Sequence, residues 1–352
     1  MNLQQRINAF SKLGAFLEQF ANIKSTQQPN IAHNESFYER FQNTIQKATQ
    51  SNAWFTYENI TFALKNWSQA LHSENLENWL SHYTFSEVKP KQVAIIMAGN
   101  IPLVGFHDFL SVLISGHKVI VKQSSNDAHL LPIIADYLTA IEPEFENYIQ
   151  FTTEKLPTFE AVIATGSNNT ARYFEYYFKG KPSIIRRNRN SVAVLTGEEN
   201  EQGLKHLSED IFRYFGLGCR NVSKLYVPKN YNFDAFFNAI YSWKDIINHH
   251  KYANNYDYNK AVYLMSEYDI LDNGFFMVKD DASNASPIST VFYEHYNSVN
   301  ELKSKLLNDK ELIQCIVSLP DLDIGIPFGS TQNPQLWDYA DNVDTVDFLL
   351  TI

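Results

Sequence analysis

The middle of the chain alternates short apolar runs with segments that repeat apolar residues at helical spacing. Val93–Met97 and Lys118–Val121 have the length and composition of buried strands, and Leu103–Ile114 between them has the spacing of a helix. A strand, a helix and a second strand within about 30 residues form a βαβ unit, in which the two strands are parallel. The alternation predicts a doubly wound α/β fold, in which ligands bind at the carboxyl ends of the strands.

The same alternation continues along the rest of the chain. We predict further helices at 128–139, 168–178, 202–215, 233–241 and 299–307, and further strands at 148–151, 161–164, 191–195, 222–227, 262–264, 275–278, 290–293, 315–318 and 345–352. Before residue 86, aromatic and aliphatic residues recur at helical spacing, which predicts four helices whose apolar faces pack into a core. The pattern changes at Ser86–Lys91, ahead of the first strand.

The composition excludes several classes of protein. Apolar residues make up 44% of the chain and charged residues 19%, which is typical of a globular protein. The 29 basic and 39 acidic residues leave a formal net charge of −10, so binding of nucleic acid is not expected. Two cysteines are too few for a disulfide scaffold or a Cys-rich metal site, and the 10 histidines show no spacing typical of a metal site.

The sequence also bears on the cellular compartment. No apolar stretch approaches the roughly 20 residues that a membrane span needs. The chain opens on an amphipathic helix and not on the charged and apolar regions of a signal peptide. Together with free thiols, which persist where the environment is reducing, these features predict a cytoplasmic protein.

Cys219 is the strongest candidate for a reactive side chain. It lies in Phe215–Asn221, between a predicted helix and a predicted strand, and two glycines in this segment let the backbone approach a substrate closely. The neighbouring guanidinium of Arg220 favours the thiolate, which is the nucleophilic form. A free cysteine is more often a small buried apolar residue, so this segment alone leaves both interpretations open. Cys315 lies in the apolar run Leu312–Leu319 and is predicted to be a core residue.

Three further segments place polar residues where a strand or its following turn ends. Lys122 ends a strand and is a candidate for holding a ribose or phosphate, although a solvated strand end is the simpler interpretation. Ser167 follows a strand and either only caps the next helix or also lies where backbone N–H groups meet a phosphate. Arg186–Arg189 contains three arginines, which form either an anion site or a solvated turn.

These segments, in this order, resemble the motifs of the aldehyde dehydrogenase superfamily. The matching segments are AGNIPL (98–103), VIVKQSS (119–125), ATGS (164–167) and GLGCRN (216–221). The closing segment IPFGS (326–330), followed by WDYADNVDTVDFL (337–349), is similar to one branch of the superfamily. That branch is the LuxC-type acyl-CoA reductases, which make fatty aldehydes. The resemblance covers approximately residues 90–352.

The resemblance implies an aldehyde-dehydrogenase-like α/β fold with two doubly wound domains. The implied division is a helical segment at 1–88, a nucleotide-binding Rossmann-like domain at 89–197, a catalytic domain at 198–330 and a C-terminal tail at 331–352. In the resembling superfamily the strand that matches the tail pairs with a neighbouring subunit, which implies a homodimer or tetramer. Pairing of this strand within its own subunit is the alternative.

The resemblance also assigns cofactor-binding residues. Lys122 matches the lysine that holds the adenosine ribose, and Ser124 follows it in the same segment. Gly166 and Ser167 match the turn that packs against the cofactor. Ser125 stands where NAD-preferring members often carry a carboxylate, and a small hydroxyl leaves space for a 2′-phosphate. The implied cofactor is therefore NADPH, with no metal.

In the catalytic machinery, Cys219 matches the nucleophilic thiol and Asn100 matches the asparagine whose amide helps to form the oxyanion hole. Two motifs depart from the superfamily pattern. Hydrolytic members carry Glu-Leu-Gly-Gly where residues 185–188 read Ile-Arg-Arg-Asn, so the general-base glutamate is absent. Exchange of an acyl group with CoA needs no activated water, so this loss suits a thioester reductase. The Glu-x-Phe-Gly-Pro motif that usually holds the nicotinamide ribose reads Ser-Asn-Ala-Ser-Pro at 283–287.

The sequence therefore predicts NADPH-dependent reduction of an acyl thioester to an aldehyde through an acyl-enzyme on Cys219. A fatty acyl group is expected, carried either by CoA or by a carrier protein. Two other classes remain open. One is a Cys-dependent acyl transferase or thioesterase that uses no nicotinamide, and the other is a non-catalytic binding protein with the same fold.

Overall fold

The structure, a computed structural model, describes residues 1–85 and 89–352. The described residues form two compact units, one of Met1–Arg187 with Gln335–Ile352 and one of Asn188–Pro334. Each unit contains one sheet whose strands are mainly parallel, which confirms the predicted α/β class. The predicted domain boundary at residue 88, and the first half of Ser86–Lys91, fall on residues 86–88, which lie outside the described residues.

The first unit is built on a five-stranded parallel sheet with the order β3-β2-β1-β4-β5. Its strands are β1 (Gln92–Ile96), β2 (Lys118–Lys122), β3 (Ile149–Phe151), β4 (Ala161–Thr165) and β5 (Ser183–Arg186). The chain moves outward from β1 to β3 and then crosses to the other side of β1 for β4 and β5. The strand order therefore reverses between β1 and β4, and in doubly wound sheets ligands bind outside the carboxyl ends of strands at such a point.

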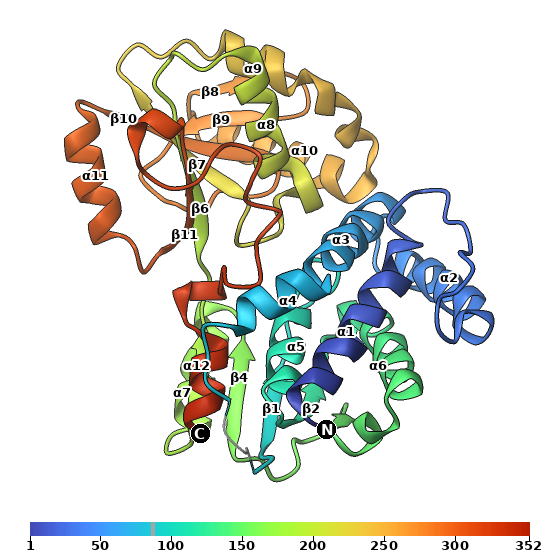
Figure 1. Cartoon of the computed structure of the whole chain (residues 1–352). Helices are drawn as coiled ribbons and strands as arrows, with labels where there is room; N and C mark the ends of the chain where they lie inside the picture. The colour runs from blue at the N-terminus through green and yellow to red at the C-terminus, as the bar shows by residue number, and fades with distance from the viewer. Residues whose placement is uncertain (86–88) are drawn as a thin grey trace. The chain divides into compact units, whose positions relative to one another are not determined.

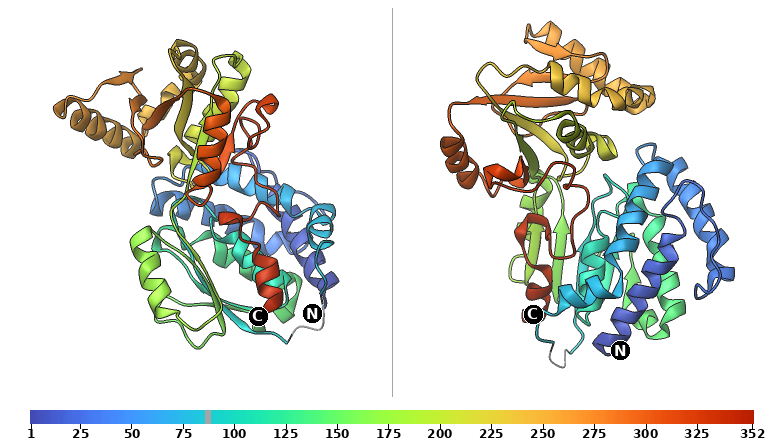
Figure 2. Two further views of the ribbon diagram at one scale, coloured as in Figure 1. Left: turned by 90° about the vertical axis from the view of Figure 1, so that its left-hand side faces the viewer. Right: turned by 45° about the horizontal axis from the view of Figure 1, so that its top comes forward.

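Alternate residues of β1 face two different cores. Val93 and Ile95 belong to the large core shared with most helices of the unit, whereas Ala94 belongs to a small core with α7 (Asn168–Tyr177). This alternation follows from the two-residue period of a strand. Figure 2 (left) shows α7, in yellow-green, on one side of the sheet and the other helices of the unit on the opposite side.

The four helices predicted before residue 86 are confirmed. The helices that residues 1–141 contribute to the large core are α1 (Leu3–Glu18), α2 (Asn34–Ser51), α3 (Tyr57–Ala70), α4 (Ser73–Leu80), α5 (Phe106–Ile114) and α6 (Leu130–Ile141). Phe10, Leu13 and Leu17 of α1 are fully buried, as their helical spacing predicts. Figure 1 shows α1 between α3 and α6, and the ring of Phe16 stacks on Tyr137 of α6 with a centroid distance of 4.0 Å.

The C-terminal segment is a helix, so the predicted strand at 345–352 is wrong. Thr345–Thr351 forms α12, and the Asp344 side chain caps it by accepting a hydrogen bond from the backbone N–H of Asp347 (2.9 Å). Val346 and Leu349, three residues apart on one helical face, are fully buried in the core of the first unit. The predicted homodimer or tetramer depended on this strand, so the structure offers no support for it from the C-terminal segment.

His117 joins this helix to the start of β2. Its ring is fully buried, and its Nδ1 accepts a hydrogen bond from the backbone N–H of Lys91 (3.1 Å). Nε2 therefore carries the proton and donates it to the backbone oxygen of Leu349 (2.8 Å). Burial lowers the pKa of His117 below its usual value, so the folded protein holds this ring in the neutral form.

We expect this histidine to make stability depend on pH. The unfolded chain binds a proton at His117 with a pKa of about 6.5, whereas the folded chain binds this proton only at lower pH. The contribution of His117 to stability is thus complete above pH ~6.5 and is lost as the pH falls from there towards the folded pKa. Urea denaturation between neutral and mildly acidic pH should show a shallower decline for His117→Gln than for the wild type. Equal slopes for the two proteins would contradict this role.

The second unit is built on a six-stranded sheet with the order β11-β6-β7-β10-β9-β8. Its strands are β6 (Asn190–Val194), β7 (Val222–Pro228), β8 (Ile270–Asp272), β9 (Met277–Asp280), β10 (Thr290–Tyr296) and β11 (Ile313–Val317). All pairings are parallel except that of β8 with β9. One face carries α8 (Glu201–Phe212) and α9 (Asp234–Ile240), and the other carries α10 (His250–Met265) and α11 (Val299–Asn308).

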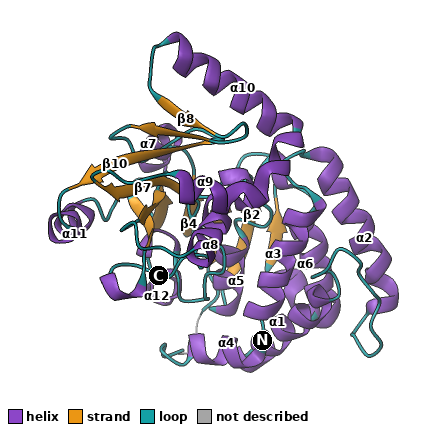
Figure 3. Cartoon of the chain, turned by 90° about the horizontal axis from the view of Figure 1, so that it is seen from above, coloured by secondary structure: helices purple, strands orange, loops and turns teal. Residues whose placement is uncertain are grey.

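Two strands of the prediction differ from the structure in this region. The predicted strand at 262–264 is wrong, because these residues lie in α10, where Tyr252, Tyr256 and Tyr263 form the buried face. The short edge strand β8 was not predicted. Figure 3 shows α10 running beside β8, and the Tyr256 hydroxyl donates to the carboxylate of Asp272 at the end of that strand (2.7 Å).

Candidate functional site

Cys219 lies in the connection between α8 and β7, at the amino end of β7, and its side chain is exposed. The helix ends at Phe212, earlier than predicted, because Tyr214, Phe215 and Gly216 have positive φ angles of 55°, 59° and 75°. Two large aromatic residues in this conformation are unusual, since a left-handed residue other than glycine costs about 1–2 kcal/mol. The chain therefore leaves the helix through a left-handed turn that sets the start of the Cys219 loop.

Ser191 of β6 connects this loop to both cysteines. Its hydroxyl donates to the backbone oxygen of Cys219 (3.0 Å) and accepts a hydrogen bond from the backbone N–H of Cys315 (3.1 Å). Cys315 is buried, which confirms its prediction as a core residue. Nη1 of Arg220 lies 3.3 Å from the Cys315 sulfur. The guanidinium is thus placed against the buried thiol, and its effect on the Cys219 thiolate stays a prediction.

The other candidate residues lie in the first unit, at the carboxyl ends of its strands. Asn100 is exposed in the connection from β1 to α5, and Ser124 lies in the connection from β2 to α6. The two connections touch: a Cβ atom added to Gly99 would lie 2.6 Å from Oγ of Ser124. A side chain at position 99 would therefore force them apart, and the glycine permits this close approach.

The segment Lys122–Ser125 ends β2 and turns into α6. Nζ of Lys122 donates to the backbone oxygen of Glu154 (3.1 Å). Oγ of Ser124 accepts a hydrogen bond from the backbone N–H of Asn126 (3.2 Å) and so starts a short 3-10 turn. Ser125 is exposed at the first position of that turn. The position assigned to the 2′-phosphate thus faces solvent.

Asp127, which the sequence analysis missed, ties these two connections together. Its Oδ2 accepts a hydrogen bond from the backbone N–H of Leu103 (2.8 Å), a residue held at a positive φ of 57°. Its Oδ1 is buried and has no hydrogen-bond partner among the described residues. Burial raises the pKa of Asp127 to about 6. A single acidic residue in a polar segment gives no sequence signal for such a role.

The turn after β4 confirms one of the predicted roles of Ser167. Its Oγ accepts a hydrogen bond from the backbone N–H of Thr170 (3.3 Å), which caps α7. A Cβ atom added to Gly166 would lie 3.0 Å from the side chain of Thr170, so this turn packs closely on the helix. Contact of either residue with a cofactor stays a prediction.

The arginine cluster is not a solvated turn as a whole. Arg186 is buried at the end of β5, and it donates to Asp108 of α5 (2.5 Å) and to the Thr345 hydroxyl (3.1 Å). Arg187 is exposed and pairs with Glu175 of α7. The segment that stands in place of Glu-Leu-Gly-Gly is thus anchored by a buried ion pair.

The segment 283–287, matched to the nicotinamide-ribose motif, lies near the nucleophile loop in the second unit. The hydroxyl of Ser223, four residues after Cys219, donates to the backbone oxygen of Asn284 (2.6 Å). The segment therefore reaches the amino end of β7, where the Cys219 loop also ends. Contact of this segment with a nicotinamide ribose stays a prediction.

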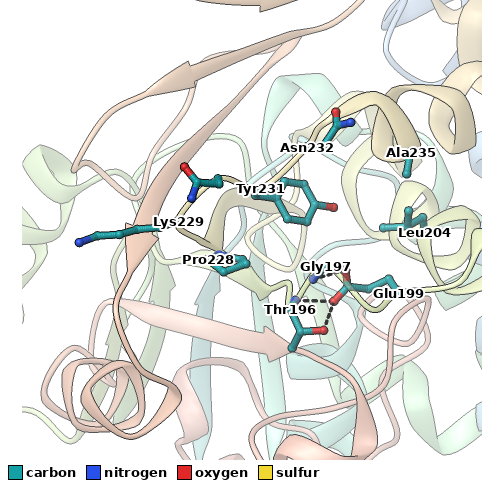
Figure 4. A pocket seen from close by; sticks show the side chains of 10 residues that line it. Thr196, Gly197, Glu199, Leu204, Pro228, Lys229, Tyr231, Asn232 and Ala235 are labelled. Carbon is teal, nitrogen blue, oxygen red and sulfur yellow. Dashed lines mark hydrogen bonds between the residues drawn. The ribbon is translucent and has the colours of Figure 1, made fainter.

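A pocket of about 330 Å³ lies elsewhere, at the carboxyl ends of β6 and β7 (Figure 4). The Glu199 carboxylate accepts hydrogen bonds from the backbone N–H groups of Thr196 and Gly197 and so occupies the polar floor of this pocket. The length of β7 separates it from Cys219 by about 20 Å. None of the candidate residues lines it.

The part of the chain that the structure describes contains no group of three or more His, Cys, Asp or Glu side chains arranged to hold a metal ion. It also contains no helix that is both long and apolar enough to cross a membrane.

No protein-family model and no curated protein matches the sequence. Solved structures do match. Aldehyde dehydrogenase 21 from Physcomitrella patens, in complex with the product succinate, matches with a TM-score of 0.67 and 12% identity over 100% of this chain and 84% of that one. Delta-pyrroline-5-carboxylate dehydrogenase from Mycobacterium tuberculosis matches with a TM-score of 0.61 and 12% identity over 99% and 77%.

The NAD⁺ complex of an aldehyde dehydrogenase from Bacillus cereus matches with a TM-score of 0.59 and 12% identity over 90% of this chain and 72% of that one. These similarities show the fold. The chain has an aldehyde-dehydrogenase-like α/β fold with two mainly parallel sheets, as the motifs predicted.

Proposed function

We propose that this chain is an NADPH-dependent acyl-CoA reductase of the LuxC type, which converts an acyl thioester to an aldehyde through an acyl-enzyme on Cys219. A fatty acyl group is the expected substrate. The observation that carries the proposal is the exposed Cys219 thiol on a fixed loop at the amino end of β7, within an aldehyde-dehydrogenase-like fold.

The first half of the proposed reaction needs only side chains and backbone of this chain. The Cys219 thiolate attacks the thioester carbonyl carbon, a tetrahedral oxyanion forms, and its collapse expels the CoA thiolate. The Asn100 amide and the Cys219 backbone N–H are assigned to stabilise the oxyanion, and one such donor is typically worth about 3–4 kcal/mol. The product of this half is an acyl-enzyme, a thioester on Cys219.

Residues at the carboxyl edge of the first sheet are suited to hold the nicotinamide nucleotide. Gly99 and Gly166 have no side chain that would stand between the backbone and a nucleotide. Lys122 lies at the end of β2, and the exposed Ser125 leaves room for a 2′-phosphate. Bound there, NADPH would supply the hydride that reduces the acyl group to the aldehyde level. The Cys219 sulfur then leaves, and the free thiol is restored.

The anchored Arg186 supports a reductase over a hydrolase. Residues 185–188 contain no carboxylate, and the buried Arg186 pairs with Asp108, so this segment offers no base to activate water. An acyl-enzyme in such a site persists until a thiol or a hydride reaches it. Incubation with a panel of acyl-CoAs and NADPH tests the proposal, with NADPH absorbance followed and the aldehyde trapped.

Each alternative gives a different result in that experiment. Release of CoA and free acid without consumption of NADPH would indicate a thioesterase. A protein that forms no acyl-enzyme and consumes no NADPH would be a binding protein with this fold.

The choice of cofactor gives a separate prediction. We expect the wild type to prefer NADPH and Ser125→Glu to prefer NADH, because the new carboxylate repels the 2′-phosphate by about 1–3 kcal/mol at a partly solvated position. The ratio of kcat/KM for the two cofactors measures this. Ser125→Gln is the control, because glutamine has the size of glutamate but no charge. It should keep most of the preference for NADPH. Equal use of both cofactors by the wild type would overturn the assignment of Ser125.

A further inference from the structure

Asn221, the residue that ends the Cys219 loop, has a buried side chain with every polar atom engaged. Its Oδ1 accepts a hydrogen bond from the backbone N–H of Gly218 (2.8 Å), directly before the cysteine. Its Nδ2 donates to the backbone oxygens of Asp210 (3.0 Å) and Arg213 (2.8 Å). The amide thus joins both ends of the loop to the last turn of α8.

These contacts satisfy groups that a helix end leaves open. The last carbonyl groups of a helix have no partner within the helix, and in this protein the chain turns left-handed directly after α8. The Asn221 amide donates to the carbonyl of Asp210 in this last turn and to the carbonyl of Arg213, the residue directly after the helix. The left-handed turn at 214–216 is therefore held from outside by the residue that also holds Gly218.

The same helical turn holds the segment IPFGS (326–330). Asp210 is fully buried, and its carboxylate accepts hydrogen bonds from the backbone N–H groups of Gly329 (2.6 Å) and Thr331 (3.0 Å) and from the Thr331 hydroxyl (2.7 Å). Two sequence motifs, GLGCRN and IPFGS, are thus attached to one residue, through its carbonyl and through its carboxylate.

We propose that Asn221 is a positioning residue for the Cys219 nucleophile and that, through Asp210, it fixes the nucleophile loop relative to segment 326–331. The role in catalysis rests on the proposed function, whereas the role in holding the loop does not. Asn221 acts on the backbone of Gly218 and not on the substrate. Its loss leaves the thiol present but lets the loop adopt several conformations.

Hydrogen exchange measured by mass spectrometry tests the structural part without any assumption about activity. Asn221→Ala should increase exchange in peptides that cover 213–221, while peptides from the first unit stay unchanged. Asn221→Ser is the second variant, in case the first does not fold. It introduces no charge and keeps a short polar side chain but removes the two amide donors, so it should show the same change to a smaller degree.

Ser208→Ala is the matched control. Ser208 is a buried polar residue of the same helix, and its hydroxyl accepts a hydrogen bond from Nε1 of Trp243 (2.9 Å). Its replacement removes a hydrogen bond from the same helix and leaves all hydrogen bonds of the Asn221 amide in place. Exchange at 213–221 should therefore stay at the wild-type level in Ser208→Ala.

The catalytic part is tested by the rate at which acyl-CoA acylates Cys219. We expect a loss of about 10- to 100-fold in Asn221→Ala with little change in the KM for acyl-CoA, because a misplaced nucleophile slows the chemical step. Wild-type exchange at 213–221 in Asn221→Ala would overturn the inference. Faster exchange with an unchanged acylation rate would overturn the positioning role. Absence of any acyl-enzyme in the wild type would overturn the proposed function and leave the exchange result to decide whether Asn221 holds the loop.

Discussion

We expect Cys219→Ala to abolish covalent labelling by radioactive acyl-CoA and to lower the rate of aldehyde formation by at least about a thousandfold. The reason is chemical: without the thiolate no covalent intermediate forms, and the remaining groups can only bind the substrate. The exposed position of Cys219 gives a thioester access to the sulfur. Mass spectrometry of the intact protein after brief incubation with acyl-CoA shows whether the acyl group is attached.

Cys315→Ala is the control for this experiment. Cys315 is buried in β11, so its removal should leave both the labelling and its rate near those of the wild type. The contact between Cys315 and Arg220 makes the control informative, since Arg220 adjoins the nucleophile in sequence. If labelling persists in Cys219→Ala and disappears in Cys315→Ala, Cys315 carries the acyl group, and the proposed mechanism is contradicted.

The parallel sheets were predictable because their strands are buried on both faces. Such strands read as continuous apolar runs, as in Val93–Met97, and the helices between them keep a clear period. β8 gave no such signal, because it has three residues at a sheet edge and two of them are exposed. The run at 262–264 is apolar yet lies in α10, where Val262 and Leu264 are exposed and the buried face consists of tyrosines.

The C-terminal helix was not predictable from local pattern. Residues 343–352 fit a strand through alternating apolar residues, and they fit a helix through Val346 and Leu349. The contact that accompanies the helix joins His117 to Leu349, which are 232 residues apart in the chain. Tertiary contacts of this kind override local propensity, and a single sequence does not display them.

The sequence neighbours of Cys219 make it a candidate nucleophile, but they do not reveal the residues that shape its loop. Tyr214 and Phe215 carry large side chains, and nothing in the sequence marks them as left-handed. Asn221 and Asp127 act through backbone groups of residues that they meet only after folding. Such side chains are indistinguishable in sequence from solvated ones.

Arg186 gives the largest expected effect on stability. We expect Arg186→Met to lower the free energy of unfolding by about 3–5 kcal/mol, because it leaves the Asp108 carboxylate buried without its ion pair. Oδ1 of Asp108 already lacks a hydrogen-bond partner among the described residues, so it offers no second contact to stabilise the unpaired carboxylate. The Thr345 hydroxyl at the start of α12 also loses a donor. Urea denaturation at neutral pH measures the change.

The chain supplies a matched control one residue away. Arg187→Met breaks an exposed pair with Glu175 and should leave the free energy of unfolding nearly unchanged, since surface ion pairs contribute little. In the double variant Asp108→Leu with Arg186→Met, both charges are replaced by apolar side chains, and most of the lost stability should return. If the double variant is as unstable as Arg186→Met alone, the cost arises from packing around the arginine and not from the stranded carboxylate. Equal losses in Arg186→Met and Arg187→Met would refute the difference in burial on which the prediction rests.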